Sequence, residues 1–256
     1  MSRQLYLECY SGISGDMTVA ALLDLGASEE VLNETLDSLM LDEFTTVVGS
    51  TYKCGIGAKT FDVRIPADPH YDEGHGMDGE HHHHDHDVRN LDDIYEILDR
   101  LEDSKVRRLA KKIFRIVAVA ESEAHQVPME EVHFHEVGAV DSIVDIVAAA
   151  TLVVNLGVDD VVISPLYEGR GHVWCQHGRM PVPAPATLNI ISAEGLTLHL
   201  TETEGEMITP TGAAIAAALR TRDKLPAEFT IQRIGIGAGK KDFKHANVLR
   251  AMLIEA

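Results

Sequence analysis

AVDSIVDIVAAATLVVNL, residues 139–156, is the stretch that decides which fold this chain adopts. Its apolar residues are not confined to one face at helical spacing, so the stretch predicts a helix that is buried nearly all round. Such a helix must lie inside the protein, with other elements packed around it. Its two aspartates, Asp141 and Asp145, need a special reason to be there, because carboxylates are rarely buried without a partner.

The segments on either side of this helix predict a mixture of strands and helices. Before it we expect a strand, a Gly-Ser turn, two helices, two strands and two more helices, at residues 3–9, 11–16, 17–26, 28–40, 44–53, 59–65, 91–102 and 104–125. After it we expect strands, two helices that begin with proline, and two strands separated by a glycine-rich loop, at 160–174, 185–193, 209–220, 228–234, 246–254 and 235–245. This order predicts an α/β or α+β protein with a mixed sheet and flanking helices.

One segment interrupts the pattern. Residues 67–89 are rich in His, Asp, Glu and Gly and poor in aliphatic residues, so they predict a flexible loop. We therefore expect an N-terminal α/β segment at 1–66, the His-rich loop at 67–89 and a main α/β portion at 90–256. With 256 residues, the chain is long enough for one large domain that this loop divides.

Charge and cysteine content narrow the possible functions. The chain has 41 acidic against 22 basic residues, a net charge of -19, which disfavours non-specific binding to nucleic acid or to anionic membranes. Three widely spaced cysteines form no C-x-x-C pair and do not suggest a disulfide framework. The first residues contain no apolar run of signal-peptide length, and no stretch is long enough to span a membrane. We expect a cytoplasmic protein.

The segment from His133 to Asp145 is the strongest candidate for chemistry. His133 and His135 are two residues apart, which places both side chains on one side of an extended backbone, and Glu136 follows. Asp141 and Asp145 share one face of a helix. Imidazole suits nickel, zinc and copper, whereas carboxylate suits magnesium and manganese. Alternatively, the histidines are polar residues at a strand edge and the aspartates pair with Arg or Lys or cap a helix.

The His-rich loop is a second candidate, for metal capture. Its tract contains His81, His82, His83, His84 and His86, which bind borderline divalent cations when these are available. A flexible tract fixes no geometry, so storage or delivery of metal is more plausible here than catalysis. The alternative is a solvated loop that binds metal only incidentally.

Three further segments place polar groups at turns or helix starts, and only the first and third of them could contact an anion. The first is Ser11-Gly12-Ile13-Ser14-Gly15-Asp16, where backbone N–H groups at a helix start can cradle a phosphate, although Asp16 could simply cap the helix. The second is the start of a helix near Thr209 and Thr211, with His177 as a further small polar candidate. The third, residues 235–241, lacks the spacing of a phosphate-binding loop, and we interpret it as a hairpin loop with a weak chance of anion contact.

Taken together, five blocks resemble the LarC family of nickel-insertion proteins. They are SGISGDM at 11–17, VHFHEVGAVDSIVDIV at 132–147, HGRMPVPAPATL at 177–188, ITPTGAA at 208–214 and GIGAGKKDFKHANVLR at 235–250. Five blocks in the same order make coincidence very unlikely, and they cover the chain from near residue 3 to its end, with the His-rich loop as a variable insert.

The resemblance implies a function and assigns residues to it. Members of this family place nickel into pyridinium-3,5-bisthiocarboxylic acid mononucleotide in a CTP-dependent reaction that makes the nickel-pincer cofactor of lactate racemase. It implies metal or substrate contact for His133, His135, Glu136, Asp141 and Asp145. It implies substrate phosphate contact for a second set, namely Ser11, Gly12, Ser14, Gly15, Asp16, His177, Thr209 and Thr211.

The resemblance also implies partners. Family members continue beyond the last block into a C-terminal domain that is associated with CTP and its Mg or Mn, so this chain resembles only the N-terminal portion. We expect it to work with that domain or with a companion chain, to form a homo-oligomer, and to serve a lactate racemase-type apoprotein.

Two other functions remain open. One is a nickel metallochaperone or store that relies on the His-rich loop. The other is a metal-independent hydrolase built around Asp16 and His135, which nothing in the spacing requires.

Overall fold

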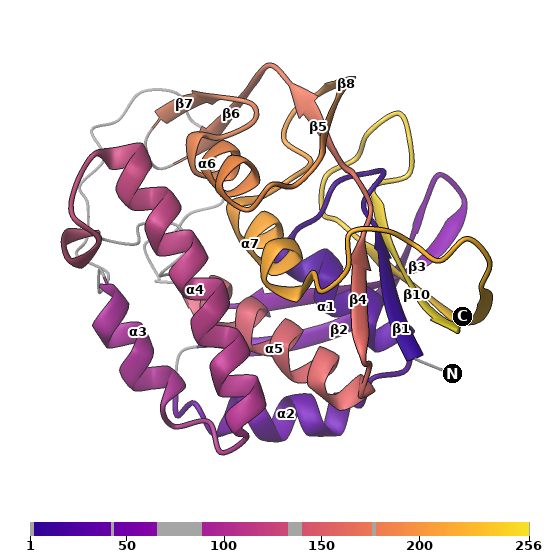
Figure 1. The fold of residues 1–256 in the computed structure, drawn as a ribbon, viewed down its shortest axis with the longest axis horizontal. Helices are drawn as coiled ribbons and strands as arrows, with labels where there is room; N and C mark the ends of the chain where they lie inside the picture. Colours follow the sequence, from indigo (N-terminus) through magenta and orange to yellow (C-terminus); the bar gives the residue numbers. More distant parts are fainter. Residues whose placement is uncertain (1–2, 42–43, 66–88, 133–139, 176–177, 256) are drawn as a thin grey trace.

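A computed structural model of the chain describes residues 3–41, 44–65, 89–132, 140–175 and 178–255. Its centre is a six-stranded mixed sheet (Figure 1). The strand order is β2 (Thr45–Lys53), β3 (Ile56–Arg64), β9 (Thr230–Ala238), β10 (Val248–Glu255), β1 (Arg3–Glu8) and β4 (Asp160–Ile163). Strand β1 is antiparallel to β10 and parallel to β4, and β3 is parallel to β9. Because strands from both sides of the His-rich tract share this sheet, the chain forms one domain of mixed α/β class, as the sequence predicts.

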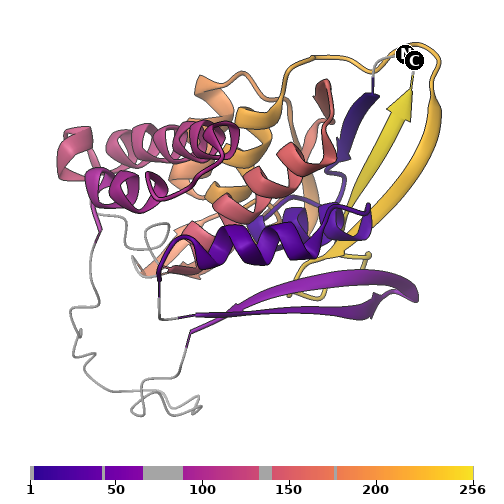
Figure 2. The ribbon, with the colours of Figure 1, turned by 90° about the horizontal axis from the view of Figure 1, so that it is seen from below.

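The helices cover one face of this sheet (Figure 2). They are α1 (Gly15–Asp24), α2 (Glu29–Asp37), α3 (Leu91–Leu98), α4 (Ser104–His125), α5 (Val140–Leu156), α6 (Pro185–Ala193) and α7 (Pro210–Leu219), with a 3-10 turn at Met129–Glu131. Helix α5 packs against α1, α2, α4 and α7, which explains its apolar surface on all sides. The prediction of a buried helix at 139–156 is confirmed.

Two further pairs of strands lie outside the main sheet. Strand β5 (Leu166–Arg170) pairs in parallel with β8 (Leu198–Glu204), and β6 (His172–Cys175) forms an antiparallel hairpin with β7 (Gly178–Pro181). Strand β8 is absent from the sequence prediction. Five of its seven residues are polar or charged and four are exposed, so it lacks the apolar alternation that identifies a strand.

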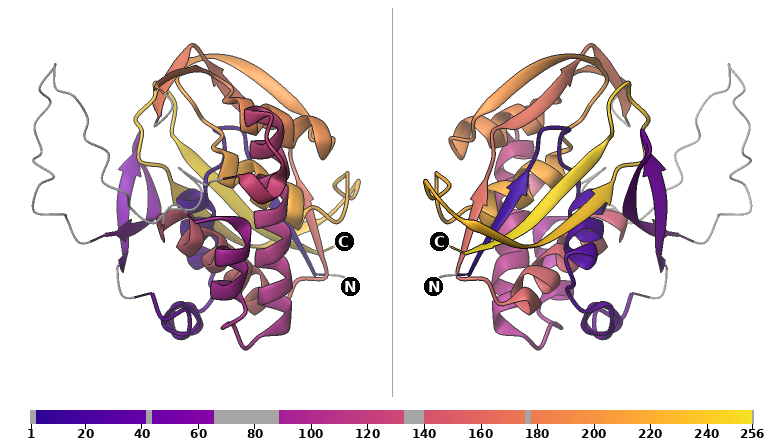
Figure 3. Two further views of the ribbon diagram at one scale, coloured as in Figure 1. Left: turned by 90° about the vertical axis from the view of Figure 1, so that its left-hand side faces the viewer. Right: turned by 90° about the vertical axis from the view of Figure 1, so that its right-hand side faces the viewer.

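The two faces of β1 show where the core lies. Leu5 and Leu7 are fully buried in the large core under the helices, whereas Tyr6 joins Met252 and Ile254 in a small cluster on the opposite face. The register of β1 with β10 places residue 3 opposite residue 255, so both ends of the chain lie together at one side (Figure 3).

The prediction of a glycine-rich loop at 235–245 is wrong for its first four residues, because β9 continues to Ala238. The reason is close helix packing. A Cβ on Gly235 would lie 2.2 Å from the backbone oxygen of Ala21, and one on Gly237 would lie 2.1 Å from that of Met17. These glycines let α1 rest directly on the sheet, so they mark a close approach and not a turn.

Two further predictions concern the division of the chain at the His-rich loop and the lack of a membrane-spanning stretch. The His-rich tract lies outside the described residues, so the division at 67–89 stays a prediction. Among the described helices, none is both long and apolar enough to cross a membrane.

Candidate functional site

Two of the predicted turns lie side by side and bring the starts of α1 and α7 together. Ile13 donates its backbone N–H to Met207 (3.0 Å), and Thr209 donates its own to Ile13 (3.1 Å). Glycines make this approach possible: a Cβ on Gly12 would lie 2.0 Å from the oxygen of Met207, and one on Gly212 would lie 2.2 Å from that of Ile13. The first turns of two helices therefore enter one site.

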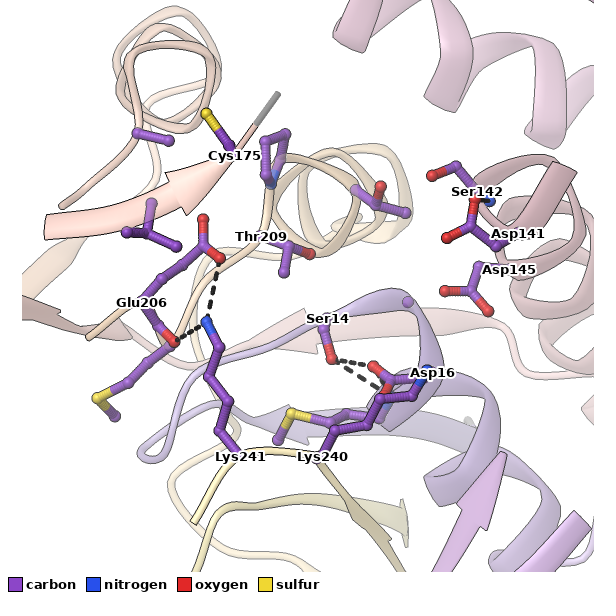
Figure 4. Close-up of a pocket in the computed structure, with 18 of the residues that line it drawn as sticks. Ser14, Asp16, Asp141, Ser142, Asp145, Cys175, Glu206, Thr209, Lys240 and Lys241 are labelled. Carbon is purple, nitrogen blue, oxygen red and sulfur yellow. Dashed lines mark hydrogen bonds and ion pairs between the residues drawn. The ribbon is translucent and has the colours of Figure 1, made fainter. Parts of the chain in front are cut away.

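A pocket of about 500 Å³ opens at this junction (Figure 4). Most of its lining comes from the start of α1, the first half of α5, the start of α7 with the residues before it, and the loop between β9 and β10. The β6–β7 hairpin contributes Val173, Cys175 and Met180, and the thiol of Cys175 lies 3.5 Å from the oxygen of Gly178.

Carboxylates form one wall of the pocket, which we call the carboxylate wall and define as Asp16, Asp141 and Asp145. Asp16 accepts hydrogen bonds from the hydroxyl of Ser14 and from the backbone N–H of Met17 (2.9 Å). Ser14 is also the N-cap of α1. The amide of Met17, in the first turn of α1, is thus bound by side chains of the same segment.

Asp145 lies directly over the first turn of α1. A Cβ on Gly15 would be 2.3 Å from its Oδ2, so glycine is required for this contact. The backbone N–H of Asp16 donates to its carboxylate, but Oδ1 is buried and has no hydrogen-bond partner among the described residues. Burial, and then the charges of Asp16 and Asp141, raise the pKa of Asp145 well above its usual range, against the opposing effect of Lys240. A hydrogen-bond donor or a cation at Oδ1 would give this buried oxygen the partner that it lacks.

Two lysines of the loop between β9 and β10 line the pocket and point in different directions (Figure 4). Lys240 pairs with Asp62 of β3 at 2.7 Å, and this hydrogen bond raises the pKa of Lys240 although burial acts to lower it. Lys241 points away from α5 toward Glu206, with 3.3 and 3.4 Å to its backbone and side-chain oxygens (Figure 4). Asp141 and Asp145 thus lie at one end of the pocket and Lys241 with Glu206 at the other, whereas Lys240 lies close enough to Asp16 and Asp145 for their charges to interact.

A buried glutamate fixes the segment that leads into α7. Glu168 is fully buried and its Oε1 accepts the backbone N–H groups of Gly169 (2.7 Å), Met207 (2.6 Å) and Ile208 (3.3 Å). Burial raises its pKa to about 7, although these hydrogen bonds act to lower it. Glu168 thus ties β5 to the pocket residues around Met207.

The structure brings together many of the predicted site residues. Those that line the pocket are Ser14, Gly15, Asp16, Asp141, Asp145, Thr209 and Thr211. Ser11 and Gly12 do not line it, and Gly12 acts through the close approach to Met207. Outside the described residues lie His133, His135, Glu136, His177, His81, His82, His83, His84 and His86. Their roles stay predictions.

The described part of the chain holds no complete metal site, since nowhere in it do three His, Cys, Asp or Glu side chains gather to hold an ion. Sequence reasoning missed Cys175, Ser142, Glu206 and Asn247, and gave Lys240 and Lys241 only a weak chance of contact. A pair of lysines after a glycine-rich strand was the available signal for the last two.

Comparison with known proteins identifies relatives for the whole chain. A family model described as "Nickel insertion protein" matches residues 5–256. A protein of Alkaliphilus metalliredigens named pyridinium-3,5-bisthiocarboxylic acid mononucleotide nickel insertion protein is 56% identical over 100% of this chain and 61% of its own length. A protein of the same name from Geobacillus kaustophilus is 42% identical over 98% of this chain and 59% of its own length. The chain thus spans about three fifths of these relatives. No solved structure matches it.

Proposed function

Because the chain belongs to the nickel insertion protein family, we propose that its pocket places nickel into pyridinium-3,5-bisthiocarboxylic acid mononucleotide, the compound in the names of its relatives. Nickel and the mononucleotide are then both substrates. The product is the nickel-pincer cofactor of lactate racemase, and the reaction is a cyclometallation of the lyase class that forms nickel–carbon and nickel–sulfur bonds.

The observation that carries this proposal is the carboxylate wall, above all the buried and unpartnered Oδ1 of Asp145. A carboxylate with a raised pKa at the surface of a pocket is typical of a functional site. An incoming divalent cation would supply the missing partner and offset the repulsion among the three aspartates.

The wall alone is an incomplete set of nickel ligands, in line with the lack of a three-residue metal site among the described residues. We propose that His133, His135 and Glu136, which immediately precede α5 in sequence, supply further ligands together with the sulfur atoms of the substrate. Imidazole and sulfur suit nickel better than carboxylate oxygen does.

The energy source and the partners are further parts of the proposal. CTP, with Mg or Mn, would bind the C-terminal domain of family members or a companion chain, and the complete machinery would be a cytoplasmic homo-oligomer that delivers its product to a lactate racemase-type apoprotein.

Reconstitution tests this function. The chain is incubated with nickel, CTP and the mononucleotide, with and without a C-terminal companion, and the product is detected by mass spectrometry and by activation of lactate racemase apoprotein. We expect a nickel-containing product from the complete assembly. If the complete assembly makes none, the proposal is wrong.

A nickel store without catalysis is the second candidate, and the His-rich tract favours it. Deletion of residues 70–86 separates the two. Loss of bound nickel with product formation intact assigns the tract to capture and leaves insertion to the pocket. Loss of both identifies delivery as the main role.

A further inference from the structure

The two helix starts in the pocket differ in what they can still bind. A phosphate is attracted to the free N–H groups and the positive end of a helix dipole. At α1 these groups already face anions: Met17 donates to Asp16, and Asp16 donates to Asp145. A phosphate placed there would replace existing hydrogen bonds and meet two carboxylates. The start of α1 is therefore a poor phosphate site, although its glycine-serine turn suggests one.

Among the described residues, no carboxylate is seen to accept from the start of α7 in this way, although Glu206 lines the same pocket and contacts Lys241. Thr209 caps the helix by accepting the N–H of Gly212 (3.0 Å), and Pro210 has no N–H to satisfy. The amide of Thr211 has no partner inside the helix, by the geometry of a first turn. Thr209 and Thr211 both line the pocket, with Thr211 only 7% exposed, so the first turn of α7 faces the pocket.

Lys241 lies on this same side of the pocket, opposite Asp141 and Asp145 (Figure 4). Its ammonium group has three donors, and its contacts with Glu206, at 3.3 and 3.4 Å, are longer than the 2.7–2.9 Å or so of a strong charge-assisted hydrogen bond. The side chain is about half exposed. It can therefore turn to a more strongly charged anion without breaking a tight ion pair.

The backbone of Lys241, in contrast, is held firmly. Its carbonyl oxygen accepts from Nζ of Lys53 (3.1 Å) and from Nδ2 of Asn247 (2.9 Å), and both donors are nearly buried. Lys53 also bonds the oxygen of Lys240 (3.3 Å) and Asp242 (2.6 Å). A loop fixed by two buried donors, with a loosely held ammonium group at its tip, is preorganised for a ligand.

We propose that Lys241 and the first turn of α7, with Thr209 and Thr211, bind a phosphate monoester, which holds the ligand with its other end toward the carboxylate wall. This subsite rests on the proposed function, since it assigns the phosphate of the mononucleotide to one side of the pocket and nickel to the other. Lys240 keeps its ion pair with Asp62 and partly offsets the negative charge of Asp16 and Asp145.

Calorimetry without nickel or CTP tests the subsite independently of insertion. The probes are nicotinic acid mononucleotide, which has a pyridinium ring and a phosphate, ribose 5-phosphate, and nicotinic acid riboside, which lacks the phosphate. We expect the wild-type chain to bind both phosphates and to bind the riboside at least about tenfold more weakly. Lys241→Met should lower the affinity for both phosphate-containing probes about tenfold and leave the affinity for the riboside unchanged. Lys241→Arg should retain most of the affinity for the phosphate-containing probes.

The matched control is Lys244→Met, because Lys244 is an exposed lysine of the same loop that does not line the pocket. It should bind all three probes like the wild type, and thermal unfolding should show that both methionine variants are folded. The proposal is overturned if the wild type does not distinguish mononucleotide from riboside, or if Lys241→Met and Lys244→Met bind ribose 5-phosphate equally well. Neither result bears on whether the complete assembly inserts nickel.

Discussion

The first turns of α1 and α7 enter the same pocket through interlocked glycine-containing segments, yet one meets carboxylates and the other meets a lysine. At α1, Asp16 and Asp145 accept the backbone N–H groups, whereas the charged groups on the side of α7 are Lys241 and Glu206, which contact each other. Two similar local sequences, SGISGD and ITPTG, thus acquire opposite electrostatic roles. The difference teaches that an anion site at a helix start is determined by what other elements place there, here α5 and the β9–β10 loop.

The largest effect should come from the glycine that lets α7 approach Ile13. Gly212→Ala would place a Cβ 2.2 Å from a backbone oxygen, and we expect a loss of about 3 kcal/mol in unfolding free energy, measured by urea denaturation. Gly15→Ala meets the side chain of Asp145, which can move, so its loss should be about 1–2 kcal/mol.

Gly57→Ala is the control for both substitutions, because a Cβ there would meet only Tyr52 at 3.7 Å and should change stability by less than about 0.5 kcal/mol. Equal losses for Gly15→Ala and Gly212→Ala would contradict the distinction between a side-chain and a backbone contact.

The pH dependence of stability examines the glutamate that holds the approach to α7. The pKa of Glu168 is raised from 4.5 to about 7 in the folded chain, so its stabilising contribution is fully present below pH 4.5 and is lost as pH rises through about 7. Glu168→Gln keeps an acceptor oxygen and cannot ionise. Between pH 4.5 and pH 8, the free energy of unfolding of the variant should rise by roughly 2–3 kcal/mol relative to that of the wild type.

The measurement is the free energy of unfolding at several pH values for the wild type, for Glu168→Gln and for Glu204→Gln, a change at an exposed position of β8. Parallel curves for all three proteins would show that Glu168 does not titrate in this range, and that the hydrogen bonds from Met207 and Ile208 outweigh its burial.

The two N-caps provide the smallest and most direct comparison. Ser14→Ala and Thr209→Ala each remove a cap, and each should lower the free energy of unfolding by about 1 kcal/mol. Only Thr209→Ala should also weaken the binding of ribose 5-phosphate, because the proposed phosphate subsite lies at α7 and not at α1. Weaker phosphate binding by Ser14→Ala, with Thr209→Ala unchanged, would move the subsite to α1.

The sequence was sufficient for most elements and for one wall of the pocket. The apolar helix at 139–156, the helix starts near residues 28 and 209 and the start of α6 at Pro185 follow from local rules, and the structure confirms them. Asp141 and Asp145 could be placed on one helix face because that relation depends on only four residues of sequence.

The other wall could not be foreseen, because it depends on long-range pairing. Lys241 reaches the pocket only because β9 and β10 lie between β3 and β1 in the sheet, and Lys53, which fixes its backbone, is 188 residues away. Glycines were also ambiguous. In β9 and at Gly12 they permit close contact with another backbone, which a single sequence does not distinguish from a turn.

In the proposed function the carboxylate wall receives nickel, and the substitution Asp145→Asn probes this role. In the reconstituted assembly with nickel, CTP and the mononucleotide, mass spectrometry measures the rate at which nickel enters the product. We predict a loss of about 10- to 100-fold, with the affinity for ribose 5-phosphate unchanged, since the amide removes the charge but keeps the shape of the side chain. Nickel insertion by Asp145→Asn at the wild-type rate would contradict the account.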